Sequence, residues 1–382
     1  MKQQRRFKAL AMVLALTIVA AGCGDDDDST SSGDSGGGGG GTEEVTGPPA
    51  VTLDDECQAA KDDGVEAPDG FRVNLVTDIG RIDDGTFNQF AYEAMQAAAD
   101  CFGFESSYIE TVSEADYATN ISTSLESSPK VLITNGFLLA TDTLAAAEAN
   151  PDVDFLGVDQ FQEEFPENYI GVQFREDQGG YMAGVLAASL SESGVVGVVG
   201  GREDVPPVVR FVNAYETGAK SVNPDIRVLS VYNESFTAPD KGASDAAQFI
   251  GEGADVIFGA GGQTGSGGIA AAAEQGVWAI GVDQDEYFTT FNGGDAPGSD
   301  KLATSAVKRV DLAVFRNIVA SMTDEFAGGL YTLEASNDGI TYAPFHDAQL
   351  PDEAVTALED ARAGLADGSI DTGVDPVTGL PL

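Results

Sequence analysis

From Phe71 onward, apolar runs of strand-like composition alternate with longer alanine-rich segments, and this alternation constrains the fold more than any other feature. The strand-like runs cover residues 71–77, 104–110, 130–134, 154–158, 169–174, 195–199, 226–232, 255–259, 277–282 and 302–305. The helical segments between them include residues 141–149, 178–190, 244–250 and 269–275. Strict alternation is typical of parallel sheets with helices on both faces. The sequence therefore predicts an α/β protein with two sheets of roughly five or six strands each.

Two short strand-like runs near the C-terminal end, 331–333 and 340–342, flank an Asn-Asp-Gly turn signal at residues 337–339. This arrangement indicates a late pair of strands. Residues 352–365 have the pattern of a helix that closes the domain. The Gly-, Asp- and Pro-rich residues 366–382 are expected to form a frayed tail.

Residues 1–22 have the features of a secretory signal peptide, with a basic start followed by the apolar run Ala9 to Ala21. The run is too short to span a bilayer as a stable helix. The residues before Cys23 resemble a lipoprotein processing site, which would make Cys23 the lipidated first residue of the mature protein. Ordinary cleavage beside an incidental cysteine is the alternative.

Residues 23–68 predict a flexible acidic and glycine-rich tether, because a stretch such as Gly36 to Gly41 cannot bury apolar surface. A tether that follows a lipidated cysteine would hold a folded domain off a membrane. We therefore expect an extracytoplasmic protein, lipid-anchored to the cell membrane at its periplasmic face or outer surface.

The chain is strongly acidic, with 63 Asp and Glu residues, 19 Lys and Arg residues and a formal net charge of −44. This balance argues against nucleic acid or an anionic membrane surface as the partner. It fits a protein that stays soluble in salty surroundings, and equally an ordinary acidic exported protein. Roughly 320 residues remain beyond the signal and tether, which is more than one compact core usually holds, so we expect two lobes.

Two cysteines remain after Cys23. In an exported protein the pair Cys57 and Cys101 suggests a disulfide, and two buried free thiols are the alternative. His346 is the single histidine, and the chain has no Cys-x-x-Cys motif. The sequence therefore predicts no zinc site, no histidine-based catalytic triad and no cofactor.

The stretch from Asp78 to Gln89 is a polar, glycine-containing loop between a strand-like run and an amphipathic segment. It places Asp78, Asp83, Phe87 and Asn88 at the carboxyl end of a strand, where open α/β sheets bind their ligands. An aromatic ring beside carboxylates and an amide suits a small ligand with a flat face and hydroxyl groups. Core packing is the alternative role for Phe87.

A glycine-rich segment covers residues 259–268 but lacks the Gly-Lys-Ser/Thr ending of a P-loop. Its glycines would let backbone N–H groups approach an uncharged polar ligand at the start of a helix. A purely structural turn is the alternative.

Several segments, taken together and in this order, resemble the basic membrane protein (BMP) family of lipoproteins between Phe71 and Phe345. The segments are Asp78–Gln89, Thr134–Phe137, Phe155–Gln160, Gly179–Gly184, Pro206–Phe211, Gly253–Phe258, Ile280–Asp285 and Thr304–Arg309. Members of this family are the substrate-binding components of ABC importers, and purine nucleosides are the ligands of the best understood ones. The resemblance implies a two-lobed type I periplasmic-binding-protein fold. Lobe 1 would hold residues 69–174 and about 284–325, and lobe 2 residues 175–283 and about 326–365.

The resemblance also implies a set of ligand-binding residues. They are Asp78, Phe87, Asn88, Asn135, Asp159, Phe211, Gly262, Asp283 and Lys308. Phe87 and Phe211 would sandwich a base from opposite lobes, and Asn88 and Asp159 would bond to base edges or ribose. Asp283 and Lys308 would act as a pair on the ribose. Helix capping is the alternative for Asp159, and a plain surface ion pair is the alternative for Asp283 with Lys308.

The resulting hypothesis is a monomeric, lipid-anchored binding protein that captures nucleosides, with purine nucleosides favoured, and delivers them to an ABC permease. The same fold with a sugar or another polar metabolite as ligand is the first alternative. A nucleoside-processing enzyme is the second and weaker one, because such chemistry requires a metal cluster or a general acid. We therefore expect a binding protein and not an enzyme.

Overall fold

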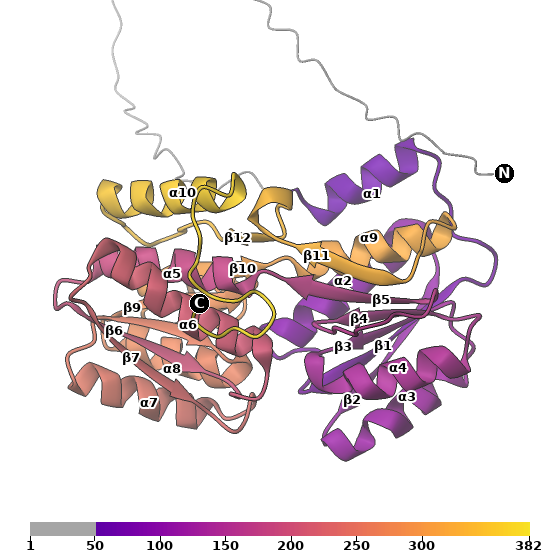
Figure 1. Ribbon diagram of the computed structural model, residues 1–382, viewed down its shortest axis with the longest axis horizontal. Helices are drawn as coiled ribbons and strands as arrows, with labels where there is room; N and C mark the ends of the chain where they lie inside the picture. The colour runs from indigo at the N-terminus through magenta and orange to yellow at the C-terminus, as the bar shows by residue number, and fades with distance from the viewer. Residues whose placement is uncertain (1–50) are drawn as a thin grey trace, which may run out of the picture. The chain divides into compact units, whose positions relative to one another are not determined.

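The computed structural model describes residues 51–382. The expected signal peptide, Cys23 and the tether up to residue 50 lie outside the described residues. Within residues 51–382, helices and strands alternate and build two lobes, each around its own sheet (Figure 1). This arrangement confirms the α/β fold that the alternating pattern predicts.

The first lobe is built on a six-stranded parallel sheet with the strand order β11-β5-β4-β3-β1-β2. Its strands are β1 (Arg72–Ile79), β2 (Glu105–Thr111), β3 (Val131–Asn135), β4 (Asp154–Val158), β5 (Tyr169–Phe174) and β11 (Gly329–Leu333). Its helices are α2 (Phe87–Phe102), α3 (Tyr117–Leu125), α4 (Ala140–Ala149) and α9 (Val310–Met322). Every residue of β3 and β4 is buried, which explains why these strands are continuous apolar runs in the sequence.

The second lobe is built on a six-stranded sheet with the order β12-β10-β9-β8-β6-β7, in which only β12 runs antiparallel to its neighbour. Its strands are β6 (Val195–Gly200), β7 (Arg227–Tyr232), β8 (Val256–Ala260), β9 (Trp278–Asp283), β10 (Leu302–Lys308) and β12 (Ile340–Tyr342). Its helices are α5 (Glu176–Leu190), α6 (Pro206–Val222), α7 (Pro239–Gly251), α8 (Gly262–Glu274) and α10 (Asp352–Ala366). Helices α5 and α6 pack together, as do α7 and α8.

The chain crosses between the lobes three times. The crossings lie between β5 and α5, between β10 and α9, and between β11 and β12. Backbone hydrogen bonds hold the crossings side by side, from Arg175 N to Leu333 O at 2.9 Å and from Arg309 N to Gly339 O at 2.9 Å. These three neighbouring segments form the hinge region between the lobes.

The lobe boundaries expected for the C-terminal third need correction. Strand β10 belongs to the second sheet although it falls within 284–325, and β11 belongs to the first sheet although it falls within 326–365. The runs 331–333 and 340–342 are therefore strands of different sheets, not a pair around the Asn-Asp-Gly turn. Local composition identifies a strand, but its partner depends on contacts with residues far away in the sequence.

The tether expected over residues 23–68 does not extend to residue 68, because helix α1 occupies Leu53–Asp62. Thr52 and Asp55 form a capping box at its start. A disulfide joins Cys57 of α1 to Cys101 of α2, and Glu56 pairs with Arg316 of α9 at 2.6 Å between Oε1 and Nη2. The crosslink and the ion pair attach to the first lobe a segment that composition alone describes as flexible.

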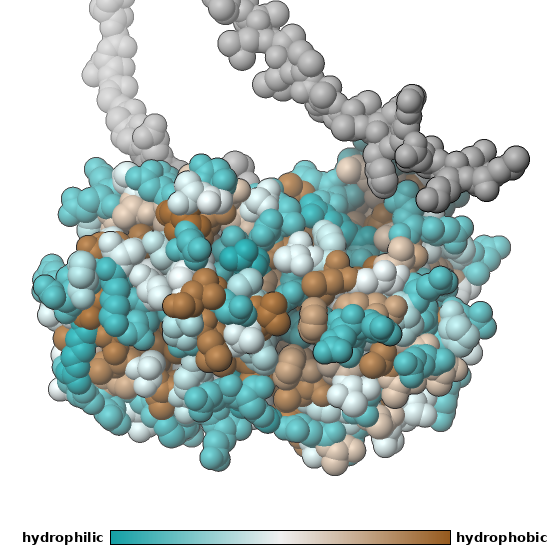
Figure 2. Space-filling model, viewed as in Figure 1, coloured by the Kyte–Doolittle hydropathy of each residue, from teal (hydrophilic) through white to brown (hydrophobic). Residues whose placement is uncertain are grey.

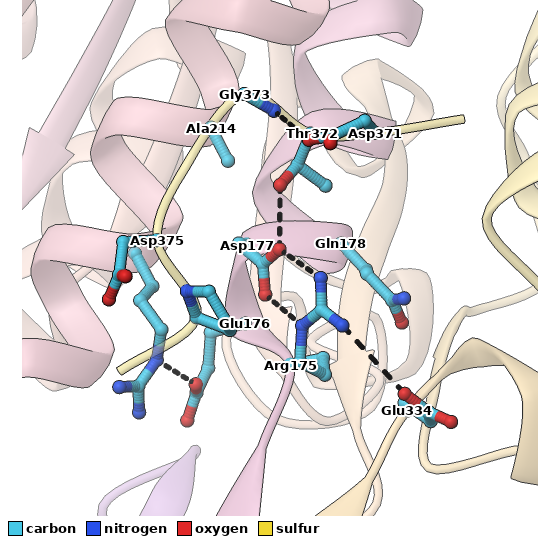
Figure 3. A network of polar contacts seen from close by, with 12 residues as sticks. Arg175, Glu176, Asp177, Gln178, Ala214, Glu334, Asp371, Thr372, Gly373 and Asp375 are labelled. Atoms are coloured by element: carbon cyan, nitrogen blue, oxygen red, sulfur yellow. Dashed lines mark hydrogen bonds and ion pairs between the residues drawn. The ribbon is translucent and has the colours of Figure 1, made fainter. Parts of the chain in front are cut away.

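The C-terminal residues are not the frayed tail that their composition predicts. Residues 371–382, here called the C-terminal strap, pack against α6, and Val374 is only 1% exposed. Thr372 Oγ1 donates to Asp177 Oδ2 at 2.7 Å (Figure 3). Asn213 Nδ2 donates to the Gly379 carbonyl at 2.7 Å. Backbone carbonyls of the strap thus satisfy polar side chains of the second lobe, an interaction that composition does not reveal.

The surface of the described residues is mixed in character. On the face drawn in Figure 2, hydrophilic residues spread over both lobes and hydrophobic ones occur in scattered groups. Among residues 51–382, no helix combines the length and apolar character needed to cross a membrane.

The Cys57–Cys101 crosslink predicts a measurable stabilisation. It closes a sequence separation of 44 residues, so its loss should lower the free energy of unfolding by about 2–4 kcal/mol. We expect a reductant to lower the melting temperature of the wild-type protein and to leave a Cys57→Ser/Cys101→Ser variant unaffected, measured by circular dichroism. Equal melting temperatures for oxidised wild type and the variant would contradict this expectation.

Candidate functional site

A cavity of about 680 Å³, open solvent at its mouth included, lies between the two lobes. Residues at the carboxyl ends of β1, β3 and β4 line it from the first lobe, and residues after β6, β8, β9 and β10 line it from the second. Ligands of α/β sheets bind outside the carboxyl ends of the strands, and both sheets direct these ends to the same space. The cavity is therefore the candidate ligand site.

A network of amides and carboxylates orders the first-lobe wall. Asn88 Oδ1 accepts from the backbone N–H of Asp78 at 3.2 Å and from Asn135 Nδ2 at 3.1 Å. Asp84 accepts from the backbone N–H groups of Thr86 at 2.9 Å and Asn88 at 3.1 Å, and so caps α2. Asn88 lines the cavity and Asn135 does not, so Asn135 acts on the wall through Asn88.

The sequence names Asp83 in this loop, but Asp84 is the residue that matters for the cavity. Asp83 is exposed and pairs with Arg81 at 2.7 Å between Oδ1 and Nε. Asp84 is buried and lines the cavity. An acidic residue just before a helix is a common cap, and this spacing is the signal that could have distinguished the two residues.

Asp78 lies at the end of β1 and accepts a hydrogen bond from the Tyr117 hydroxyl. Burial raises the pKa of Asp78 to about 6, and the bond from Tyr117 opposes this rise. Tyr117 belongs to α3 and is buried, and no motif around it pointed to the site. Tyr117 reaches Asp78 because α3 packs beside the end of β1, and the local sequence does not reveal this packing.

Two aromatic rings reach the cavity from opposite lobes. Phe87 is the first residue of α2 and is half-buried, whereas Phe211 of α6 is 4% exposed and meets Phe258 edge-on. Phe137 and Phe236 also line the cavity, and the sequence did not single them out. The cavity therefore offers apolar, flat surfaces on both sides.

A buried charge cluster adjoins the cavity, and two of its members, Asp159 and Lys308, line it. Lys308 is 2% exposed, and its Nζ lies 2.6 Å from Asp159 Oδ2 and 2.8 Å from Glu176 Oε1. The same Nζ lies 5.0 Å from the ring centroid of Phe87, within the range of a cation–π contact. Glu176 Oε2 also accepts from Arg210 Nε at 2.5 Å. Two cations and two carboxylates thus neutralise one another away from water.

The joint action of Lys308 and Asp283 on a ribose stays a prediction. Burial raises the pKa of Asp283 and the charge of Lys308 opposes this rise, but the two side chains form no direct ion pair among the described residues. Both residues line the cavity, but within the described chain Lys308 forms its ion pairs with Asp159 and Glu176. The reason lies in the crossings, because Glu176 follows β5 directly where β5 leaves the first lobe and so approaches the end of β10. Glu176 was missed because nothing in its local sequence distinguishes it from a surface glutamate.

Asp159 and Asp283 occupy matching positions in the two lobes. Each follows a Gly-Val step at the end of a buried strand, and each has a left-handed backbone, with φ of 61° at Asp159 and 67° at Asp283. Aspartate tolerates this conformation better than most residues. The turn directs each carboxyl group to the cavity that the strand ends surround.

Burial dominates the ionisation of both carboxyl groups. It raises the pKa of Asp159 to about 6 and the pKa of Asp283 to about 7, and in each case the charge of Lys308 opposes the rise. Asp159 Oδ1 is buried and has no hydrogen-bond partner among the residues that the structure describes. The two carboxyl groups therefore present acceptors suited to hydroxyl groups of a ligand.

Gly262 lies at the first turn of α8, so the glycine-rich segment is the start of a helix. Gly262 has a φ of 56° and lines the cavity. A Cβ on the preceding Gly261 would lie 2.4 Å from the backbone nitrogen of Gly201, so the two loops pack backbone to backbone. This close packing accounts for part of the glycine content.

The lobes touch one another around the cavity. Gln284 Nε2 donates to the Thr86 carbonyl at 3.1 Å, and Thr289 Oγ1 donates to the Gly85 carbonyl at 2.8 Å. Arg202 after β6 forms an ion pair with Glu114 after β2. Contacts of this kind between lobes describe a closed arrangement around the site.

The donor set does not match a metal centre. Across residues 51–382, no group of three or more His, Cys, Asp or Glu side chains is arranged to hold a metal ion. What the cavity supplies is flat apolar surface, buried acceptors and one charge-paired lysine. These features serve binding.

The fold and the site together define a class of protein. The structure is similar to a solute-binding protein of an ABC transporter system from Aeropyrum pernix K1, with a TM-score of 0.69, 22% sequence identity, and coverage of 79% of this chain and 92% of that one. This likeness confirms the type I periplasmic-binding-protein fold, with two lobes around a ligand cavity.

The family follows from the sequence comparisons. Residues 71–354 match the Bmp family, described as "ABC transporter substrate-binding protein PnrA-like", and the chain belongs to this family. It is therefore an extracytoplasmic substrate-binding component of an ABC transporter, not an enzyme.

Two curated relatives illustrate the family. The CD4+ T-cell-stimulating antigen of Listeria innocua is 30% identical over 82% of this chain and 92% of the relative. The ABC transporter nucleoside-binding protein BmpA of Lactococcus lactis is 32% identical over 78% of this chain and 88% of the relative.

The raised pKa of Asp283 predicts how stability depends on pH. An aspartate unfolded in water has a pKa of about 3.9, so the folded state holds a proton that the unfolded state loses between about pH 4 and pH 7. The contribution of Asp283 to stability is therefore present below about pH 4 and is lost as the pH rises to about 7.

We expect Asp283→Asn to remove this loss and to stabilise the ligand-free protein at pH 7 by about 2–4 kcal/mol, but not at pH 4. Denaturant unfolding at several pH values measures the difference. The matched control is Asp300→Asn, which removes the same charge from an exposed side chain. If both variants show the same pH dependence as the wild type, the burial of Asp283 has no effect on its ionisation.

Proposed function

We propose that this substrate-binding protein captures nucleosides, with purine nucleosides favoured, and delivers them to an ABC permease from a lipid anchor at the membrane. The observation that carries the proposal is one cavity in which Phe87 and Phe211 come from opposite lobes and the carboxyl groups of Asp159 and Asp283 lie beside them. A nucleoside has a flat base and a ribose with hydroxyl groups, and the two parts match these two kinds of surface.

The energies of these contacts support a nucleoside over a simple sugar. Stacking of an aromatic side chain on a base contributes about 1–3 kcal/mol. Ribose hydroxyl groups can donate to Asp283 and to the unpartnered Oδ1 of Asp159. The relative BmpA of Lactococcus lactis carries the name nucleoside-binding protein, which supports the same ligand class.

The mechanism we propose is closure around the ligand. The three crossings between the lobes lie side by side and provide a hinge. A ligand that contacts both Phe87 and Phe211 interacts with both walls only when the lobes are closed, so it favours the closed form. The closed form would then be the one that the permease recognises, and a single chain carries the whole site.

The ligand class is tested by thermal shift on residues 51–382 with purine and pyrimidine nucleosides, free bases, ribose and other sugars. A ligand at 100 times its Kd adds about 2.7 kcal/mol to the folded state and should raise the melting temperature by several degrees. We expect inosine, guanosine or adenosine to do so, and free bases or ribose alone to give no comparable shift. A shift with sugars only, or with no compound, would reject the nucleoside assignment.

The aromatic contact has its own test. Phe211→Ala should weaken nucleoside binding roughly 5- to 150-fold, because one stacking surface is lost. Isothermal titration calorimetry measures the change. Phe161→Ala is the matched control, since Phe161 is 44% exposed and does not line the cavity. Equal affinities for the two variants would show that Phe211 does not contact the base.

The lipid anchor rests on Cys23 and the residues before it. We expect the full-length protein expressed in a bacterium to incorporate labelled palmitate and to sediment with membranes. A Cys23→Ala variant should do neither, while the Cys57→Ser/Cys101→Ser variant should still be labelled. Labelling of Cys23→Ala would contradict the anchor and would leave the ligand assignment untouched.

A further inference from the structure

Arg210 is a buried arginine that does not line the ligand cavity. It lies on α6 immediately before Phe211 and is only 3% exposed. Its Nε lies 2.5 Å from Glu176 Oε2, and its Nη1 donates to the Val377 carbonyl of the C-terminal strap at 2.9 Å. A buried guanidinium thus connects the strap to a buried carboxylate.

That carboxylate leads to the ligand site. Glu176 is fully buried at the start of α5, and its Oε1 lies 2.8 Å from Lys308 Nζ. Lys308 Nζ in turn lies 2.6 Å from Oδ2 of Asp159, whose carboxyl group lines the cavity. The contacts run without a break from the strap through Arg210, Glu176 and Lys308 to Asp159.

We propose that Arg210 is a positioning residue for the ligand site and that the C-terminal strap holds Arg210 in place. The assignment of Asp159 as a ligand contact rests on the proposed function, whereas the chain of charges does not. With Arg210 present, the two cations and two carboxylates balance. Without Arg210, Glu176 and Asp159 compete for Lys308, because a buried charge is costly unless it is paired.

The strap contacts two neighbours of Glu176, namely Asp177 and Arg210. Thr372 donates to Asp177, which also accepts two hydrogen bonds from Arg175, at 2.8 Å from Nε and 2.7 Å from Nη2 (Figure 3). The strap also accepts from Arg210. Glu176 is therefore fixed between two residues that the strap contacts directly, at a crossing between the lobes.

The glycines of the strap offer a matched pair of substitutions. A Cβ on Gly379 would lie 2.8 Å from the backbone nitrogen of Arg210, so Gly379→Ala must displace the strap. Gly373 has nearly the same φ, 72° against 77°, but the atom nearest to a new Cβ there is Thr217 Cγ2 at 3.7 Å. Gly373→Ala therefore introduces the same backbone strain without the clash at Arg210.

Several other charged groups act on Asp159, and the test must keep them constant. Besides Lys308, they are Glu176, Arg210, Asp78 and Asp283. Substitution of Arg210 alone leaves all the others in place. Arg316→Gln serves as the arginine control, since Arg316 pairs with Glu56 of α1 and neither residue lines the cavity.

The first experiment measures inosine affinity by calorimetry between about pH 5.5 and pH 8. Affinity should rise with pH as the carboxyl groups of the cluster lose their protons. We expect Arg210→Gln to weaken binding about tenfold or more at neutral pH. It should also move this rise to higher pH, because without the Arg210 charge the carboxyl groups of the cluster have a higher pKa. Arg210→Lys should restore the wild-type pH profile, since it restores the charge. Gly379→Ala should weaken binding, and Gly373→Ala and Arg316→Gln should leave it unchanged.

The second experiment needs no ligand and measures unfolding of the same variants against pH. Arg210 lowers the pKa of Glu176 against the opposing effect of burial, so the stabilisation is present at neutral pH and is lost in acid. The deficit of Arg210→Gln relative to wild type should therefore shrink as the pH falls. A deficit that is constant with pH, or equal affinities for Gly379→Ala and Gly373→Ala, would overturn the proposal.

The two experiments also separate this proposal from the proposed function. If the wild-type protein does not bind inosine, the nucleoside assignment fails for this probe, and the ligand-free pH dependence still decides whether Arg210 governs the charge cluster. If inosine binds and Arg210→Gln matches the wild type at every pH, the positioning role fails and the nucleoside assignment stands.

Discussion

The structure of the site depends on the burial of Lys308 between Asp159 and Glu176. Lys308 ends a strand of the second lobe, Asp159 follows a strand of the first, and Glu176 lies where the chain passes from one lobe to the other. Because an unpaired buried charge is costly, these three side chains must stay in contact if any of them is to remain buried away from water. One ion cluster therefore links a crossing between the lobes to the cavity wall formed by Asp159 and Lys308.

Two of the crossings contain the same local arginine–aspartate pair. At each of these an arginine lies two residues before an aspartate, Arg175 with Asp177 and Arg309 with Asp311, and each pair forms two parallel hydrogen bonds. Bidentate arginine–carboxylate pairs are strong and geometrically specific. Each pair fixes the turn from a strand in one lobe to a helix in the other, so the hinge region is ordered where the backbone leaves its sheet.

Sequence reasoning succeeded where a signal is local. The buried parallel strands are continuous apolar runs, so strands such as Val131–Asn135 and Asp154–Val158 lie within one residue of their predicted bounds. Asp78 and Asn88 were placed at the site because ligands bind at the carboxyl ends of strands, whereas Asn135 and Asp159 were implied by the family resemblance. Reasoning failed where an interaction joins distant segments: the sheet membership of β10 and β11, the packing of the strap, and the direct ion-pair partners of Lys308. Tyr117 and Glu176 have no local signal and reach the site only through packing.

By itself, the sequence determined the fold class, the family and most of the polar residues at the strand ends, because apolar periodicity and short motifs are properties of neighbouring residues. Tertiary structure alone decided which of those residues act together. Lys308 forms its direct ion pairs with Asp159 and Glu176, not with Asp283, because the chain crosses between lobes just where these side chains lie. Charge pairing depends on distances of a few ångströms across the fold, and such distances cannot be read from the order of residues along the chain.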